Sequence, residues 1–194
     1  MTRLAMMALV VLFAAGCATV EPVKTEPPKP EARQPLDFRR TTLIVRDIDR
    51  SLALYRDALG MTVYYDQQLT SPRLQRKGSD GVNRSRLVLL KANDGFVGLL
   101  GLWQFLDGPK PPAPPVKPDF APNEIVVLFN ADDLEQRFEK VRATPGVTIM
   151  SEPALRAYPG ANGTEIRVMV SMLTDPDGHV VELNKALSAL PSMK

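Results

Sequence analysis

The sequence VRDIDRSLALYRDALGM, at residues 45–61, decides the fold class of this chain. Its middle part predicts a helix over residues 51–59, because large apolar residues recur at positions i, i+3 and i+7 and therefore share one helical face. These residues are Leu52, Tyr55 and Leu59. Asp47 or Asp49 can cap the start of the helix, and Gly60 stands where a left-handed residue commonly ends one. The stretch therefore predicts a helix with a defined start and a defined end.

Strands are predicted on both sides of this helix. The segment before it, residues 41–45, is β-branched and apolar, and turn-forming residues separate three later segments of the same kind. The later segments are residues 61–65, 86–91 and 96–103. The first half of the domain therefore has the order βαβββ.

The second half of the chain repeats that order. A strand at residues 125–129 precedes a helix that Asp132 or Asp133 can cap, and the apolar residues of that helix share one face. The strands predicted after it are residues 147–150, 166–172 and 180–183. Two modules of about 65 residues, at about 37–105 and 123–186, therefore indicate an internally duplicated α+β domain.

A proline-rich segment, residues 108–122, joins the two modules. The chain has 18 prolines, most of them in this segment and in residues 22–35. Proline cannot donate a hydrogen bond to a sheet, so the stretch GPKPPAPPVKP is expected to form an extended surface crossover. Use of the same stretch as a ligand for an SH3-type domain is the alternative.

The first 16 residues are expected to be a signal peptide. Arg3 precedes an apolar run at residues 4–13, which is shorter than the roughly 20 residues that span a bilayer. Small residues follow and end at Cys17, the only cysteine. The order AAGC resembles a bacterial lipobox, which implies cleavage after Gly16 and a lipid on the Cys17 thiol. An ordinary secretory signal that contains a cysteine is the alternative.

Residues 17–36 are expected to form a tether between the lipid and the domain. They hold several prolines and mixed charges with almost no large hydrophobic residue, so they cannot bury a core. The domain is expected at residues 37–186, and a tail at 187–194. By resemblance to enterobacterial sorting, Ala18 in place of an aspartate favours the outer membrane over the inner one. The protein is therefore expected in the cell envelope, lipid-anchored and facing the periplasm.

The charge of the chain indicates no nucleic-acid partner. The sequence has 24 Lys and Arg residues against 22 Asp and Glu residues, with a formal net charge of +2. Such a balance provides no strong field that would attract a polyanion. Nucleic-acid binding is therefore not expected.

Two motifs resemble the vicinal oxygen chelate (VOC) superfamily of glyoxalases, bleomycin resistance proteins and dioxygenases. Residues 45–61 are similar to the first strand-helix unit of that family, and DPDGHVVEL at residues 175–183 resembles its terminal turn and strand. The motifs occur in the expected order and at the expected separation, so the resemblance covers about residues 37–186. It implies two βαβββ modules that form a cupped mixed sheet.

The resemblance also implies four metal ligands inside the cup, a histidine and a carboxylate from each module. The divalent cation that they hold binds vicinal oxygens of the substrate. The family's spacing places Arg40 at the first histidine position, and Gly98 or a neighbour at the first carboxylate position. In the second module it places Val126, with Glu124 nearby, and Glu182, the only matching residue. The usual metal site is therefore expected to be absent and no cofactor is predicted. A divalent metal at an atypical site is the alternative.

Glu182 would be costly in an apolar cup without a basic partner, and Arg40 is expected to supply one. Arg86 and Arg167 are expected to join them if their side chains face the cleft, which would create a site for an anionic small molecule. Arginines that face solvent are the alternative. The only histidine, His179, is expected to stabilise its turn, and a role as general base is the alternative.

Three functions are consistent with these residues. The preferred interpretation is a binding module of the envelope that holds a small organic ligand without a metal. Whether the protein is an enzyme is left undecided, and a glyoxalase-like lyase, isomerase or dioxygenase with an atypical metal site is the second interpretation. An envelope protein with a purely structural role is the third. A homodimer that swaps modules between chains, an arrangement common in the family, is a further alternative.

Overall fold

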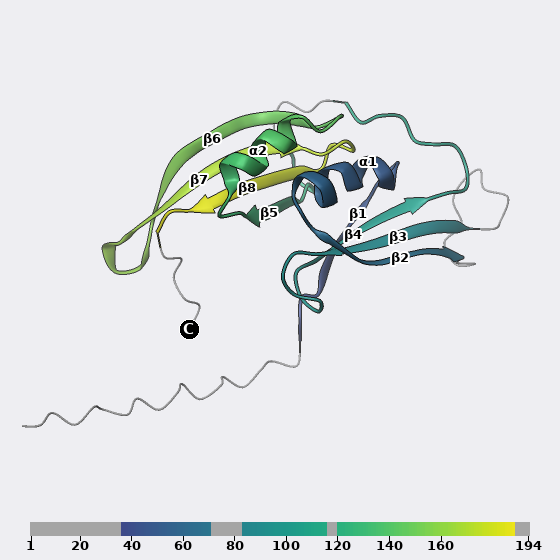
Figure 1. Ribbon diagram of the computed structural model, residues 1–194, viewed down its shortest axis with the longest axis horizontal. Coiled ribbons are helices and arrows are strands. Elements are labelled where there is room, and N and C mark those ends of the chain that lie inside the picture. The colour runs from purple at the N-terminus through teal and green to yellow at the C-terminus, as the bar shows by residue number, and fades with distance from the viewer. Residues whose placement is uncertain (1–35, 71–82, 116–119, 189–194) are drawn as a thin grey trace, which may run out of the picture. The chain divides into compact units, whose positions relative to one another are not determined.

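The computed structural model describes residues 36–70, 83–115 and 120–188 (Figure 1). All of them belong to one compact unit, Leu36–Lys194. The expected signal peptide, Cys17 and the tether up to residue 35 lie outside the described residues, as does the tail from residue 189. No helix in the described ranges has the length and apolar character needed to cross a membrane.

Two four-stranded sheets repeat one topology. The strands are β1 (Arg40–Ile44), β2 (Thr62–Thr70), β3 (Arg84–Lys91) and β4 (Leu99–Phe105), followed by β5 (Val126–Asn130), β6 (Thr148–Pro159), β7 (Glu165–Thr174) and β8 (Val180–Ala186). The first sheet has the order β1-β4-β3-β2 and the second the order β5-β8-β7-β6. In each sheet the first strand is parallel to the last, and the other neighbours are antiparallel. The α+β class and the duplicated order are therefore confirmed.

The first helix covers residues 48–58, so it begins three residues before the predicted range of 51–59, directly after the candidate cap Asp47. It consists of α1 (Ile48–Leu52) and, directly after it, a π-helical stretch, η1 (Ala53–Ala58). The Asp47 carboxylate caps its start by accepting hydrogen bonds from two backbone amides at 3.2 and 3.4 Å. Gly60 follows it with φ of 72°, in the left-handed region that favours glycine. The expected cap and the expected end are therefore confirmed.

The second helix, α2 (Leu134–Arg142), has the expected apolar face but no side-chain cap. Leu134, Phe138 and Val141 are its buried residues. Asp133 occupies the N-cap position, yet its carboxylate accepts from the Arg137 guanidinium at 2.9 and 2.8 Å instead of from the backbone. The expectation that Asp132 or Asp133 caps this helix is therefore wrong for the side chains, although the helix lies where it was predicted.

One apolar core is shared by the two modules. The buried residues are Leu43, Val45, Ile48, Leu52, Leu54, Tyr55, Ala58, Leu59, Met61, Val88, Leu90, Leu100 and Leu102 from the first module and Leu134, Phe138, Val141, Leu173, Val181 and Leu183 from the second. The Tyr55 ring lies 6.3 Å from the ring of Phe129, across the two modules. Full burial of one such side chain contributes roughly 1.5–3 kcal/mol. The core therefore holds both modules in a single unit.

The opposite face of each sheet, called here its open face, points away from this core. Successive side chains of a strand alternate between the two faces of its sheet. Leu43 of β1 belongs to the core, so Arg40 lies on the open face of the first sheet. Leu183 of β8 belongs to the core, so Glu182 and Asn184 lie on the open face of the second.

Two strands are much longer than the sequence indicates. β2 and β6 were expected at residues 61–65 and 147–150, but they continue to Thr70 and Pro159. Both are edge strands with mostly exposed side chains, so their outer halves lack the apolar alternation that marks a half-buried strand. Each also has a bulge, between Val63 and Tyr65 in β2 and after Ile149 in β6, that interrupts any strict alternation.

The crossover contains no strand in its described part, residues 108–115 and 120–122. Lys110 Nζ donates to the Asp47 carboxylate at 3.0 Å, which connects the crossover to the start of α1. Pro114 packs against Gly178, where an added Cβ would lie 3.0 Å from the proline ring. Gly178 also has φ of 85°, so a larger residue would disturb both the turn and the crossover.

Candidate functional site

A cavity of about 410 Å³ lies beside Arg40 on the first sheet. The residues that line it are Arg39, Arg40, Tyr64, Leu89 and Leu99. The lining thus combines two cations, one aromatic ring and two leucines, and it includes no acidic residue. Its volume is within the range of small-molecule pockets in proteins.

The two arginines of this cavity differ in how they are held. The Arg39 guanidinium lies 4.0 Å from the centroid of the Phe96 ring, and its Nε donates to the Phe96 carbonyl at 3.2 Å. The Arg40 guanidinium forms no hydrogen bond or ion pair within the described part of the chain. Arg40 is therefore the cation of the cavity that is available to a ligand.

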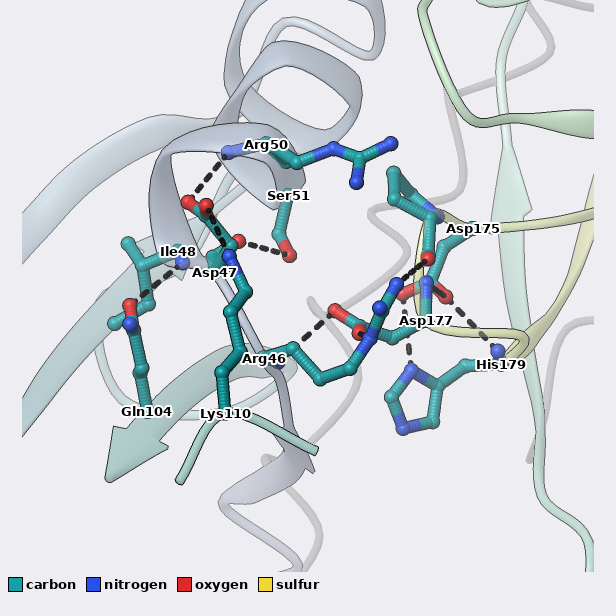
Figure 2. Close-up of polar contacts among 11 residues, drawn as sticks. Arg46, Asp47, Ile48, Arg50, Ser51, Gln104, Lys110, Asp175, Asp177 and His179 are labelled. Carbon is teal, nitrogen blue, oxygen red and sulfur yellow. Dashed lines mark hydrogen bonds and ion pairs between the residues drawn. The ribbon is translucent and has the colours of Figure 1, made fainter. Parts of the chain in front are cut away.

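A larger cavity, of about 470 Å³, lies beneath the crossover, but its charged groups are already paired. Arg46 Nε contacts the Asp177 carboxylate at 2.6 Å, and Lys110 contacts Asp47 (Figure 2). The Arg46 and Asp177 side chains are only 16% and 5% exposed. These pairs connect the loop after β1 to the turn before β8 and to the crossover. The charged groups of this cavity therefore stabilise the fold and are not available to a ligand.

Glu182 lies half-buried on the open face of the second sheet. Its Oε1 accepts a hydrogen bond from Asn184 Nδ2 at 2.7 Å. Within the described ranges it makes no ion pair with Arg40. The expected Arg40–Glu182 pair is therefore not formed. Arg40 lies on the open face of the first sheet and Glu182 on that of the second.

Arg86 does not share the face of Arg40. Its guanidinium contacts Asp66 at 2.7 and 2.8 Å and Asp49 at 2.9 Å, next to the start of α1. Hydrogen bonds to these carboxylates hold the pKa of Arg86 above its usual range and that of Asp66 below its own. Arg86 therefore lies on the helix side of the first sheet, which is the face opposite the open face, and not at its expected place in the cup.

Arg167 is separated from Glu182 in the same way. It precedes Met169 by two positions on β7, and Met169 packs against the core. Its Nε lies 3.9 Å from the Glu165 carboxylate, with both side chains more than half exposed. Arg167 therefore lies on the helix side of the second sheet and does not join Glu182.

The turn before β8 is built around a fully buried carboxylate. Asp175 Oδ1 accepts from the backbone amides of Asp177 and His179 at 2.8 and 2.9 Å. Its Oδ2 lies 3.0 Å from His179 Nδ1 and accepts from the Tyr55 hydroxyl at 3.0 Å (Figure 2 shows the bonds to His179). His179 thus stabilises the turn, as expected, and Asp175 connects that turn to the helix of the first module.

Burial and the neighbouring carboxylate of Asp175 raise the pKa of the Tyr55 hydroxyl well above its ordinary value of 10.0. The folded chain therefore keeps Tyr55 protonated at a pH where the unfolded chain ionises it. A raised pKa contributes stability that is fully present below pH 10.0 and is lost as pH rises above it, by up to about 1.4 kcal/mol per pH unit. Tyr55→Phe is expected to flatten this alkaline loss in urea unfolding measured from pH 8 to 11, with Tyr158→Phe, at an exposed tyrosine, as the control. Parallel pH curves for Tyr55→Phe and the wild type would contradict the assignment.

Comparison with known proteins adds the family. The sequence profile of the Glyoxalase/Bleomycin resistance protein/Dioxygenase superfamily matches residues 38–183, which is most of the chain. The chain belongs to this superfamily. In each sheet the first and last strands along the chain are parallel neighbours. The two sheets are the modules that the motifs at residues 45–61 and 175–183 imply.

The chain is similar to several solved structures, and the fold likeness rests on the first of them. A glyoxalase family protein from Bacillus cereus matches at 12% identity over 82% of this chain and 99% of its own, with a TM-score of 0.56. The trypanothione-dependent glyoxalase I of Leishmania major matches at 20% identity over 78% and 86%, with a TM-score of 0.47. An integron cassette protein of V. cholerae matches at 22% identity over 79% and 98%, with a TM-score of 0.44. None of the curated proteins matches the chain.

The register shows which residues stand at the metal positions that the family resemblance implies. Arg40 and Val126 begin their strands at the histidine positions, paired with Leu99 and Val180. Two residues further along β4 and β8 stand Gly101 and Glu182, so Gly101 and not Gly98 is the counterpart of Glu182 in the first module. Gly101 packs tightly against Thr42, whose Oγ1 would lie 2.7 Å from an added Cβ.

These four residues do not fit the divalent ion of the superfamily. Glu182 alone offers an oxygen ligand, and the Arg40 guanidinium would repel a cation. Throughout the described ranges, no group of three or more His, Cys, Asp or Glu side chains gathers as a metal would require.

Proposed function

We propose that this member of the superfamily is a lipid-tethered protein of the cell envelope that binds a small organic anion beside Arg40, without the divalent ion that its relatives use. The observation that carries the proposal is the unpaired Arg40 guanidinium at a cavity of about 410 Å³ whose lining has no acidic residue. Arg40 is exposed there, so its guanidinium is accessible to an anionic ligand.

The chemistry of the lining indicates the kind of anion. A guanidinium binds a carboxylate or phosphate through two parallel hydrogen bonds, which makes arginine well suited to planar oxyanions. Leu89 and Leu99 provide an apolar wall, and the exposed Tyr64 ring can cover a flat or aliphatic group. The ligand is therefore an organic carboxylate with an apolar body.

Arg40→Ala is expected to lower the affinity of the full chain for n-hexanoate by at least tenfold, because a charge-assisted hydrogen bond contributes about 1.5–3 kcal/mol. Isothermal titration calorimetry measures the effect. Arg156→Ala is the matched control, since Arg156 is an exposed arginine of β6 that lines no part of this cavity. Equal affinities of the Arg40→Ala variant and the wild type would overturn the proposal.

The same titration separates the proposal from the enzymatic alternative. If hexanoate binds only when a divalent ion is added, and EDTA abolishes the binding, the protein uses an atypical metal site. Binding that is independent of EDTA and depends on Arg40 supports the anion site.

A further inference from the structure

Asn184 has a polar atom without a partner on the open face of the second sheet. The residue is only 7% exposed, and its Oδ1 is buried and forms no hydrogen bond in the part of the chain that the structure describes. Its Nδ2 donates to Glu182 Oε1 at 2.7 Å. A carboxylate can only accept, so this bond fixes the amide with its NH₂ group toward Glu182 and its oxygen away from it.

A buried acceptor without a donor costs free energy, and folded proteins satisfy nearly all such groups. Asn184 and Glu182 lie on β8, the strand between β5 and β7, so they are near the middle of the sheet and not at a frayed end. The two side chains together present several acceptor positions, and the one hydrogen bond between them runs from Asn184 Nδ2 to Glu182 Oε1. What the pair lacks is a hydrogen-bond donor from outside.

The surroundings of Glu182 are apolar, whereas Asn184 lies opposite Asn130 of β5 and Val170 of β7. In the register of the sheet, Glu182 is flanked by Leu128 of β5 and Met172 of β7. Leu128 is 57% exposed and Val126, on the same face, is 43% exposed. No basic residue in the described ranges forms an ion pair with Glu182. One negative charge therefore lies half-buried in an accessible apolar face.

We propose that Glu182 and Asn184 form a binding site for a primary ammonium group attached to an apolar body. An ammonium group carries three donors and no acceptor, which matches a carboxylate oxygen and an amide oxygen that both need donors. Its positive charge pairs with Glu182, which accepts a hydrogen bond from Asn184 but forms no ion pair within the described ranges. The apolar body contacts the neighbouring Leu128 and Met172 side chains. This site lies on a different sheet face from the Arg40 cavity and does not depend on it.

The test compares three probes with the same six-carbon body: n-hexylammonium, n-hexanol and n-hexanoate. Titration of the full chain by calorimetry is expected to show hexylammonium binding at least tenfold more tightly than hexanol, because only the ammonium satisfies both acceptors. Glu182→Gln, which keeps the shape but removes the charge, is expected to abolish that preference. Asn184→Ser is expected to weaken hexylammonium binding severalfold.

Matched controls separate this site from the rest of the protein. Glu165→Gln makes the same chemical change at a carboxylate that is 63% exposed, and it is expected to leave hexylammonium binding unchanged. Arg40→Ala is expected to leave it unchanged as well, while it weakens hexanoate. The two proposals can therefore fail independently of each other.

Three outcomes would overturn the ammonium site. The first is equal affinity of the wild type for hexylammonium and hexanol. The second is unchanged hexylammonium binding in a Glu182→Gln variant that melts at the wild-type temperature. The third is displacement of hexylammonium by micromolar Mn²⁺ or Zn²⁺ through Glu182, which would show that the carboxylate serves a metal instead.

Discussion

Asp175→Ala is expected to lower the free energy of unfolding by about 3–5 kcal/mol, since unsatisfied buried donors cost roughly 1–3 kcal/mol each. The Asp175 side chain is fully buried and contacts two backbone amides, the His179 ring and the Tyr55 hydroxyl at 2.8–3.0 Å. Alanine removes the acceptor that these four groups share. Because Tyr55 and Asp175 belong to different modules, the loss should weaken the docking of the modules as well as the turn. Urea unfolding at pH 7, followed by circular dichroism, measures the change.

Asp57→Ala is the control for this measurement. The Asp57 side chain is 55% exposed and pairs only with the adjacent Arg56, so its removal should change stability little. A double-mutant cycle between Asp175→Ala and Tyr55→Phe should show clear coupling, because the two side chains contact each other. Additive effects of the two substitutions would mean that Asp175 stabilises its own turn and does not connect the modules.

The parts of the fold that depend on local sequence were predictable. The cap at Asp47, the end at Gly60 and the tight turn at Asp175 to Gly178 each arise from residues that satisfy or replace backbone groups within a few positions. The apolar face of α2 follows from helical periodicity in the same way. These features place both modules without any knowledge of long-range contacts.

The side-chain composition of the site was not predictable to the same degree. A strand places neighbouring residues on opposite faces, so an error of one residue in register moves a side chain from the open face to the helix side. Arg86 and Arg167 are placed in the cup for their charge alone. The acids that contact Arg86 on the other face, Asp49 and Asp66, lie far away in sequence.

The positions of Gly101 and Asn184 also depend on long-range packing. Gly101, not Gly98, is the counterpart of Glu182, because β4 begins at Leu99, one residue after the left-handed Gly98. The orphaned Oδ1 of Asn184 had no signal in the sequence, since an asparagine in a strand is ordinary until its neighbours fail to supply a donor. Such a group becomes visible only when the whole sheet face is known.

Cys17→Ser is expected to remove nearly all lipid from the mature chain, because only a thiol accepts the diacylglycerol that a lipobox directs to this position. In cells that process lipoproteins, the wild type should partition into the detergent phase with a mass that lacks residues 1–16 and includes the lipid. One acyl chain alone gives weak and reversible membrane binding, so stable anchoring of the proposed lipoprotein requires more than one chain at this cysteine. The serine variant should partition into the aqueous phase, unless its signal peptide stays uncleaved, and the intact mass distinguishes these two results. A wild-type mass without lipid, or a serine variant that is cleaved and still partitions into detergent, would show that the AAGC sequence belongs to an ordinary secretory signal and that the domain is not tethered through Cys17.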